Sequence, residues 1–340
     1  NMQKLRSVII GCGAIFPMHA ASIQANEYAQ LVAVCDICEE KAKARAQECN
    51  CRYYTDYKIM LEQEKPDSVH ICLPHYLHAP VSIYALEHGC HVLCEKPMAT
   101  TVEDAQRMID AAQKSGKTLE IIFQNRYNPG SRLIKETVAS GKLGKVLGAR
   151  ALVCWDRSQE YYSESGWRGT IEKEGGGVCV NQAIHTLDLM LWFCGKQPVS
   201  VKASLDTRAH EIEVEDDASG MITFGDGTRA NFWFTNNYCS DAPVEVELIC
   251  ENGTAKLVGD KAEISFENGE RLSAQNSDEV FSYGAMKNYW GVSHVKQINN
   301  YYSYLMNEEA LFVDYKDAFE THKVMCAVLA SGRENKVITL

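Results

Sequence analysis

Short apolar runs alternate with amphipathic stretches through the first third of the chain, and this alternation limits the possible fold more than any other feature. Apolar runs lie at residues 7–11, 31–36, 53–55, 68–74 and 91–95, and helical patterns include 17–28, 39–48 and 101–114. Strands that are apolar on both faces are typical of a parallel sheet covered by helices. We therefore predict an α/β fold that begins with a doubly wound parallel sheet with right-handed crossovers.

The pattern changes after about residue 125. Residues 199–273 read as strand, turn, strand, with hairpin signals at Asp226-Gly227, Asn252-Gly253 and Asn268-Gly269. Alternation at 218–224 and 229–235 predicts antiparallel strands with one buried face. Helical patterns at 293–306 and 315–332 follow. We expect two domains, 1–124 and 125–340, the second of α+β type.

Composition excludes several classes of partner. The 340 residues leave room for roughly two domains. Net charge is −11, without a basic run, which argues against nucleic acid or an anionic membrane surface as partner. Apolar runs are far shorter than the roughly 20 residues of a membrane span, and no signal-peptide pattern occurs. We therefore expect reduced thiols and a cytoplasmic protein.

Glycines follow the first predicted strand. Gly11 and Gly13 allow a tight turn, so that the next helix can point its N-terminus at a pyrophosphate. Phe16 replaces the usual small residue at the last position of this motif. Asp36 ends the second strand, where a carboxylate accepts hydrogen bonds from an adenosine ribose. Ile37 and Cys38 come directly after Asp36, with no arginine in place for a 2′-phosphate, so the sequence predicts NAD and favours it over NADP.

Four cysteines have spacing that zinc ligands also show. They are Cys35, Cys38, Cys49 and Cys51. Cys35 falls within a predicted buried strand, and Asp36 between the first two already has a role. We therefore expect no metal.

A lysine ends the last strand of the first predicted sheet. Lys96, within Glu95-Lys96-Pro97, follows the run at 91–95, and ligands bind at the carboxyl ends of parallel strands. The alternative is a surface lysine in a turn.

Residues 178–194 are apolar nearly all round and predict a buried helix. Asn181, His185 and Asp188 recur on it at i, i+4 and i+7, which forms one polar stripe. Buried polar groups need partners, so the stripe is either a site or a satisfied network. His185 is accordingly either catalytic or structural.

These motifs together resemble the glucose–fructose oxidoreductase / inositol dehydrogenase / MocA (Gfo/Idh/MocA) family over essentially the whole chain. The marks are Gly11-Cys12-Gly13, Val34-Cys35-Asp36, Pro74 with His78, Glu95-Lys96-Pro97, Arg126-Tyr127, Trp167-Arg168, the triple glycine at 175–177, His185 with Asp188, and Tyr289-Trp290-Gly291 with His294.

The resemblance implies a Rossmann domain over 1–124 and, over 125–340, a substrate domain with a large, mostly antiparallel open sheet that forms homodimers or homotetramers. It implies NAD(P)-dependent oxidation or reduction of a sugar, sugar derivative or cyclic polyol. Lys96 would bind the reacting hydroxyl, and His185 would be the general acid or base. Implied cofactor contacts are Gly11, Gly13, Ala14, Ile15, Asp36, Pro74, His78, Glu95 and Lys96.

Candidate substrate contacts are Arg126, Tyr127, Trp167, Arg168, Gln182 and His294. Core or interface packing is the alternative for the aromatic residues. For Arg168, the alternative is an ion pair with Glu164 or Glu172.

One position departs from many polyol dehydrogenases of the family, which have aspartate four residues before the histidine. Asn181 stands there and can orient an imidazole but cannot stabilise its cation by charge. Asp188 could partly substitute if it faces the same way. Two other functions therefore stay open: an enzyme that keeps its NAD and recycles the hydride during glycoside cleavage, epimerisation or rearrangement, and a non-enzymatic sugar or cofactor sensor.

Overall fold

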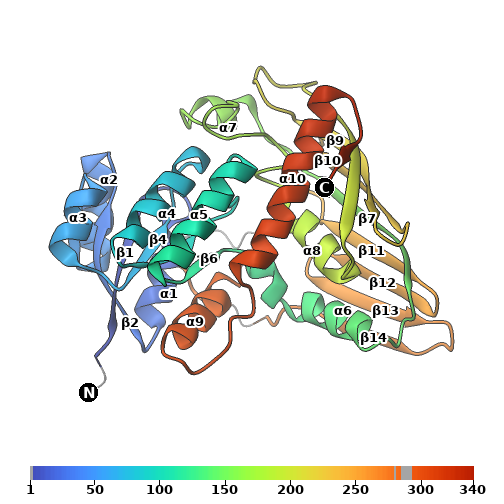
Figure 1. The fold of residues 1–340 in the computed structure, drawn as a ribbon, viewed down its shortest axis with the longest axis horizontal. Helices are drawn as coiled ribbons and strands as arrows, with labels where there is room; N and C mark the ends of the chain where they lie inside the picture. Colours follow the sequence, from blue (N-terminus) through green and yellow to red (C-terminus); the bar gives the residue numbers. More distant parts are fainter. Residues whose placement is uncertain (1–2, 279–280, 285–292) are drawn as a thin grey trace. The chain divides into compact units, whose positions relative to one another are not determined.

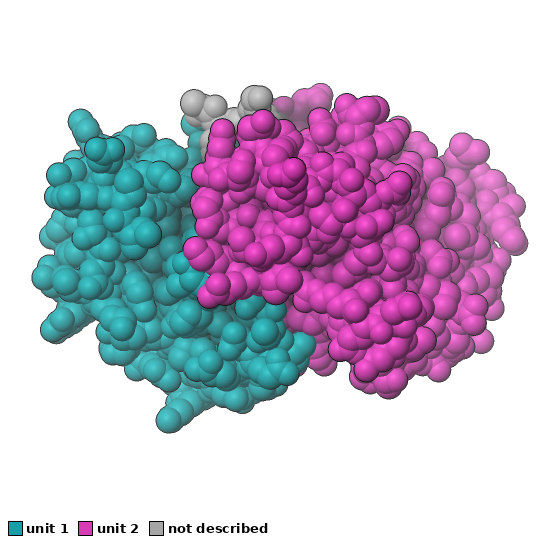
Figure 2. Space-filling model, turned by 90° about the horizontal axis from the view of Figure 1, so that it is seen from above, with its two compact units in different colours: residues 1–124, 279–318 teal, residues 125–278, 319–340 magenta. Residues whose placement is uncertain are grey.

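The computed structural model describes residues 3–278, 281–284 and 293–340. Tyr289-Trp290-Gly291, one mark of the family resemblance, lies outside the described residues. The chain divides into two compact units, residues 1–124 with 279–318 and residues 125–278 with 319–340 (Figure 2). The sequence suggested a single boundary after residue 124, whereas the structure also assigns 279–318 to the first unit.

The first unit contains a six-stranded, all-parallel sheet in the order β3-β2-β1-β4-β5-β6. This is the strand order of Rossmann folds, and it confirms the predicted doubly wound sheet. The strands are β1 (Leu5–Ile10), β2 (Ala29–Cys35), β3 (Arg52–Tyr54), β4 (Ser68–Ile71), β5 (His91–Cys94) and β6 (Leu119–Ile121).

Most helices of the first unit follow its strands as the alternation predicted. They are α1 (Phe16–Ala25), α2 (Glu39–Cys49), α3 (Tyr57–Glu64), the 3₁₀ turn η1 (His75–Leu77), α4 (His78–Glu87), α5 (Val102–Ser115) and α9 (His294–Leu305). Side-chain caps fix where two of them begin: Asp56 accepts from the Lys58 amide at α3, and Thr101 accepts from the Asp104 amide at α5.

Helix α9 joins the first unit although it follows β14 (Arg271–Ala274), a strand of the second unit, in the chain (Figure 1). Its Ile298, Tyr301 and Tyr302 are fully buried in one apolar cluster with Phe16 and Ile23 of α1. Burial of this apolar surface explains why residues 279–318 belong to the Rossmann unit.

The second unit contains a nine-stranded sheet in the order β14-β13-β12-β11-β7-β10-β9-β8-β15. Neighbours are antiparallel except β7 and β10, which confirms the expected mostly antiparallel sheet. The strands are β7 (Val146–Cys154), β8 (Pro198–Asp206), β9 (Asp217–Phe224), β10 (Arg229–Thr235), β11 (Glu245–Cys250), β12 (Gly253–Val258), β13 (Lys261–Phe266), β14 (Arg271–Ala274) and β15 (Ile338–Thr339).

Helices α6 (Pro129–Ala139) and α8 (Ile184–Cys194) contact strands of this sheet (Figure 1). The short 3₁₀ turn η2 (Gln124–Tyr127) precedes α6, and α7 (Gln159–Ser163) and α10 (Tyr315–Glu334) complete the helices. Among the described residues, no helix combines the length and the apolarity that a membrane crossing requires.

The predicted helix at 178–194 begins later than expected, at Ile184. Residues 177–183 form turns, and the amides of the first three of these residues bond to Glu215. The Glu215 carboxylate accepts from Gly177 and Cys179, at 2.8 and 3.1 Å, and its carbonyl accepts from Val178 at 3.0 Å. Asn181 therefore lies in the turn that leads into α8, and not on the helix itself.

Candidate active site

The turn after β1 leaves room for a phosphate group. Gly11 has φ +103°, and a Cβ there would lie 2.2 Å from the carbonyl oxygen of Cys72. At Gly13, by contrast, a Cβ would meet no described atom within 4 Å. Ala14 and Ile15 complete the turn into α1. The geometry fits the close backbone approach that a pyrophosphate requires at this position.

Asp36 follows β2 and is fixed by two backbone amides. Its carboxylate oxygens accept from Cys12 at 2.9 Å and from Cys38 at 2.8 Å. Ile37, the next residue, is 94% exposed. The carboxylate thus lies beside the glycine turn, where a nucleotide ribose would bind.

His78 connects the loop after β4 to the loop after β5. Its Nδ1 lies 2.6 Å from the carbonyl oxygen of Pro97, and its Nε2 lies 2.7 Å from that of Leu73. The ring is buried, which lowers the pKa of His78, although both carbonyls oppose this shift. His78 therefore holds in place the segment that carries Lys96. The side chain of Lys96 is half-buried.

Glu95 is buried between two histidines. Its Oε1 accepts from Nε2 of His19 at 2.8 Å and from Nε2 of His294 at 2.9 Å. Burial alone would raise the pKa of Glu95, but the two imidazoles, His294 first, hold it well below its usual value. His294, which the family resemblance suggested as a substrate contact, thus bonds to Glu95 inside the first unit.

His19, Glu95 and His294 are also the one group of metal-type donors that gathers within 4.8 Å in the part of the chain described. Their separations are those of hydrogen bonds. The chain of bonds continues from Nδ1 of His19 to His70 at 2.9 Å and from His70 to the hydroxyl of Tyr302 at 2.7 Å. Each contact of this network joins two groups that can act as hydrogen-bond donor and acceptor.

The cysteines weighed as zinc ligands have different surroundings. Cys35 is buried and Cys51 is half-buried, and burial raises the pKa of each thiol to about 12.

In the second unit, α8 carries His185 as its second residue and Asp188 one turn later. Both oxygens of Asp188 bond to Arg126, and one also accepts from the hydroxyl of Thr321 at 2.6 Å. Asp188 thus pairs with Arg126, and the expectation that it could stand in for the carboxylate missing at Asn181 finds no support in these contacts.

The turn before α8 is bound to α7 by a shared hydroxyl. The oxygen of Tyr161 accepts from Nδ2 of Asn181 at 3.1 Å and from Nε2 of Gln182 at 2.9 Å. Nδ2 of Asn181 also donates to Oε2 of Glu174 at 3.1 Å. Two residues of the predicted site, Asn181 and Gln182, therefore belong to one network with two residues that the sequence did not indicate.

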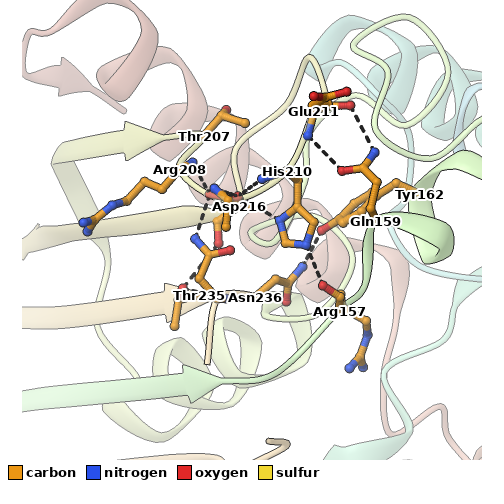
Figure 3. Close-up of polar contacts among 12 residues, drawn as sticks. Arg157, Gln159, Tyr162, Thr207, Arg208, His210, Glu211, Asp216, Thr235 and Asn236 are labelled. Atoms are coloured by element: carbon orange, nitrogen blue, oxygen red, sulfur yellow. Dashed lines mark hydrogen bonds and ion pairs between the residues drawn. The ribbon is translucent and has the colours of Figure 1, made fainter. Parts of the chain in front are cut away.

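The network continues to the end of β10 (Figure 3). Nδ2 of Asn236 donates to the hydroxyl of Tyr162 at 2.7 Å. It also donates to Oε1 of Gln182 at 3.0 Å. The ring of Tyr162 contacts that of His210 edge-on, with centroids 5.0 Å apart. His210 in turn lies between Oδ2 of Asp216, 2.8 Å from Nδ1, and the carbonyl of Arg157, 2.5 Å from Nε2 (Figure 3).

The remaining candidate substrate contacts lie in different surroundings. Tyr127 is buried, with the guanidinium of Arg132 5.5 Å from its ring centre. Arg168 lies over the rings of Tyr161 and Trp167, at 4.3 and 5.1 Å. Within the described residues, Arg168 forms no ion pair, so pairing with Glu164 or Glu172 does not occur there.

Glu174 and His19 were missed at the sequence level for different reasons. Glu174 directly precedes the triple glycine, and an acid beside a segment predicted to be buried was the one available signal. His19 lies within an otherwise ordinary helical pattern, and only the fold brings it to Glu95.

Two family models match the chain. Residues 5–123 match the model of the Gfo/Idh/MocA oxidoreductase family for its NAD-binding Rossmann fold, and residues 131–256 match the model of the Gfo/Idh/MocA C-terminal domain.

Two relatives illustrate the range of named activities. D-glucoside 3-dehydrogenase of Escherichia coli K12 is 36% identical over 232 residues, 67% of this chain and 63% of that protein. The 2,7-anhydro-N-acetylneuraminate hydratase of Mediterraneibacter gnavus is 30% identical over 222 residues, 65% of this chain and 58% of that protein. The matched regions thus span less than two thirds of these relatives.

Among solved structures, the WlbA dehydrogenase of Bordetella pertussis, in complex with NADH and UDP-GlcNAcA, aligns with a TM-score of 0.89 and 27% identity, over 99% of this chain and 98% of that one. With both domain models matched across most of its length, the chain belongs to the Gfo/Idh/MocA oxidoreductase family.

Proposed function

We propose that the protein is an NAD-dependent oxidoreductase that transfers a hydride between nicotinamide and a hydroxyl or keto carbon of a sugar, sugar derivative or cyclic polyol. The observation that carries the proposal is the glycine turn beside the Asp36 carboxylate, within a domain that matches an NAD-binding family model. The names of relatives, which include a glucoside dehydrogenase and inositol 2-dehydrogenases, support the substrate class.

The first unit has residues suited to hold NAD. Gly11, Gly13, Ala14 and Ile15 would bind the pyrophosphate, and Asp36 would bind the adenosine ribose. Bound NAD supplies the acceptor or donor of the hydride. Neither of the two residues directly after Asp36 is an arginine, and the exposed Ile37 offers no charge to a 2′-phosphate, which favours NAD over NADP.

The chain's own contribution is to bind the reacting oxygen and move its proton. Lys96 donates a hydrogen bond to the hydroxyl, which lowers its affinity for the proton. His185 accepts that proton during oxidation and returns it during reduction, because imidazole exchanges protons near neutral pH. Tyr127, Trp167, Arg168 and Gln182 stay candidates for the pocket that selects the substrate.

The test begins with cofactor content. Purified protein is desalted and denatured, released NAD and NADP are quantified, and turnover is followed by nicotinamide absorbance with a methyl D-glucoside, myo-inositol and levoglucosan. We expect NAD binding and turnover of at least one compound. Protein that binds neither cofactor would contradict the proposal.

The variant His185→Ala separates catalysis from folding. It should abolish turnover and leave the affinity for NAD nearly unchanged, because His185 lies in the second unit and the nucleotide turn in the first. Equal loss of turnover and NAD binding would indicate that His185 is structural.

A second candidate function keeps NAD bound and returns the hydride to the product. The relative named as a hydratase favours it, because hydration has no net redox change. Retention of about one NAD per chain after desalting, with product formed and no net nicotinamide absorbance change, would support this function over the simple dehydrogenase.

We further propose that copies of the chain associate through the exposed face of the nine-stranded sheet. Leu147 on β7, Trp233 on β10 and Ile249 on β11 are 56%, 41% and 41% exposed. Apolar side chains of this size favour contact with another protein surface. Sedimentation of the wild type and of Trp233→Lys tests this, with dissociation expected only in the variant.

A further inference from the structure

The carboxylate of Glu174 joins two segments of the candidate site. Its Oε1 accepts from the amide of Gly169 at 3.0 Å, directly after Trp167 and Arg168, and its Oε2 accepts from Nδ2 of Asn181 at 3.1 Å. Glu174 is 1% exposed. One buried carboxylate therefore holds both the Arg168 segment and the turn that precedes α8.

The amide of Asn181 has a fixed orientation as a result. Its Nδ2 donates to Glu174 and to the hydroxyl of Tyr161, so both protons of that nitrogen are used and Oδ1 is the acceptor atom of the amide. This turn leads directly into α8: Ala183 bonds to Val178 at 2.9 Å, and His185 follows two residues later. A displaced Asn181 would therefore move the start of the helix that carries His185.

We propose that Glu174 is a positioning residue for the reaction. Glu174 supplies, from outside α8, the negative charge that Asn181 lacks, and it fixes the turn before His185. This inference rests on the proposed oxidoreductase function. Through Asn181, Glu174 takes the place of the aspartate that many polyol dehydrogenases of the family have at that position.

The surroundings of Glu174 make its charge sensitive to pH. Burial raises the pKa of Glu174 to about 7, and the hydrogen bonds from the Gly169 amide and the Asn181 side chain oppose this rise. Of two nearby charges, Glu215 raises the pKa further and Arg168 lowers it. Tyr161, the other titratable group bonded to Asn181, has a pKa that burial raises above its usual value, so it stays neutral. Glu174 is therefore the group of this cluster that gains its charge near neutral pH.

The same geometry explains why residue 181 is an asparagine. An aspartate at 181 would place a second carboxylate oxygen about 3 Å from Oε2 of Glu174, and two carboxylates so close cannot both ionise. An ionised carboxylate can therefore be present at residue 174 or at residue 181, but not at both. This reciprocity gives a paired test.

The experiment compares wild type, Glu174→Gln, Asn181→Asp and the double variant Glu174→Gln/Asn181→Asp. Glu120→Gln is the matched control, because it removes another buried carboxyl with a raised pKa, in the first unit. For each protein, kcat and KM are measured between about pH 5.5 and 9 with NAD⁺ and the compound that wild type turns over best. NAD affinity and thermal stability are measured alongside.

We expect wild-type kcat to fall below about pH 7, in step with the loss of charge on Glu174. Protonation of His185, which can accept a proton only when it is neutral, adds to this acid limb. Glu174→Gln should therefore reduce the limb to the part that is due to His185 and lower kcat about ten- to hundredfold at pH 8, with a small change in KM. Asn181→Asp should lose a similar factor, and the double variant should recover most of it. Glu120→Gln should keep the wild-type profile.

An Asn181→Asp variant as active as wild type, a double variant no better than Asn181→Asp alone, or an unchanged acid limb in Glu174→Gln would each overturn the inference. If Glu174→Gln fails to fold, the comparison of Asn181→Asp with Asn181→Ser decides, since only the aspartate adds a competing charge and should be the less active. Absence of wild-type turnover would instead contradict the proposed function itself.

Discussion

Arg126 and Asp188 form a two-pronged ion pair inside the second unit, with Nε–Oδ2 and Nη2–Oδ1 distances of 2.8 and 2.7 Å. Their side chains are 4% and 1% exposed. The guanidinium also lies 5.0 Å from the ring centre of Trp192. The pair connects the start of the second unit to α8, and so anchors the helix that carries His185.

Removal of the charge on Asp188 should be strongly destabilising. Asp188→Asn leaves the buried guanidinium of Arg126 without its counter-charge, which typically costs about 3–5 kcal/mol. We expect the free energy of unfolding in urea to fall by this amount. Arg107→Gln, which breaks an exposed pair with Asp104 on α5, should change it by less than about 1 kcal/mol. Equal effects of the two substitutions would contradict this account.

The two glycines of the nucleotide turn should respond differently to a methyl group. Gly11→Ala places its Cβ 2.2 Å from the Cys72 carbonyl at a positive φ, so the variant should lose stability together with NAD binding. Gly13→Ala meets no described atom within 4 Å and should fold with an unchanged Tm, yet bind NAD more weakly. Calorimetric melting and NAD titration of both variants check this. Tight NAD binding by Gly13→Ala would show that the pyrophosphate does not bind at this turn.

Much of the fold could be predicted because its signals are local. The parallel strands show continuous apolar runs, and the antiparallel strands alternate around turns such as Asp226-Gly227. The position of Asp36 could be predicted for the same reason, since the residue lies at the end of a predicted strand. The late start of α8 could not be predicted, because the amides of Gly177 and Cys179 donate hydrogen bonds to Glu215, which is distant in sequence.

The site was predicted less completely because its polar partners come from separate elements. Glu174 and Tyr161 meet Asn181 through packing of α7 and two loops, and no periodic pattern marks them. His19 and His294 reach Glu95 from α1 and α9, which lie almost at opposite ends of the chain. The roles of Lys96 and His185 stay predictions that need kinetic tests.

Asp216 should stabilise the loop between β8 and β9. Its carboxylate accepts from the amides of Arg208 and Ala209, at 2.8 and 2.9 Å, and bonds to His210 at 2.8 Å. Burial alone would raise the pKa of Asp216, but the hydrogen bonds from these donors outweigh burial and lower it. Because the folded value is depressed, the stabilisation is present above the unfolded value of 3.8 and is lost as pH falls through the folded one.

Asp216→Asn places an amide against several donors and should lower the free energy of unfolding by about 1–3 kcal/mol at pH 7. The difference from wild type should shrink as the pH falls below about 4. Limited proteolysis should then cut the loop at 207–215 faster. Asp206→Asn, at the exposed end of β8, is the control, and cleavage as rapid in this control as in Asp216→Asn would speak against the role of Asp216.

Glu120 on β6 should make the protein less stable at alkaline pH. The side chain is fully buried: Oε1 accepts from Gln297 at 2.9 Å, and Oε2 meets no hydrogen-bond partner among the described residues. Burial raises its pKa to about 8, helped by the charge of Asp314 and opposed by Gln297. The folded value exceeds the unfolded value of 4.5, so the neutral carboxyl is favoured by folding.

The contribution of Glu120 is therefore fully present below the unfolded pKa and is lost as pH rises through the folded one. At about 1.4 kcal/mol per pKa unit, the loss by pH 9 is several kcal/mol. Glu120→Gln, which is neutral at every pH, should melt at a higher temperature than wild type at pH 9 and at a similar temperature at pH 5. The control Glu267→Gln, in an exposed turn, should follow wild type at both pH values. A Tm difference between Glu120→Gln and wild type that is the same at pH 5 and pH 9 would show that Glu120 stays ionised in the folded protein.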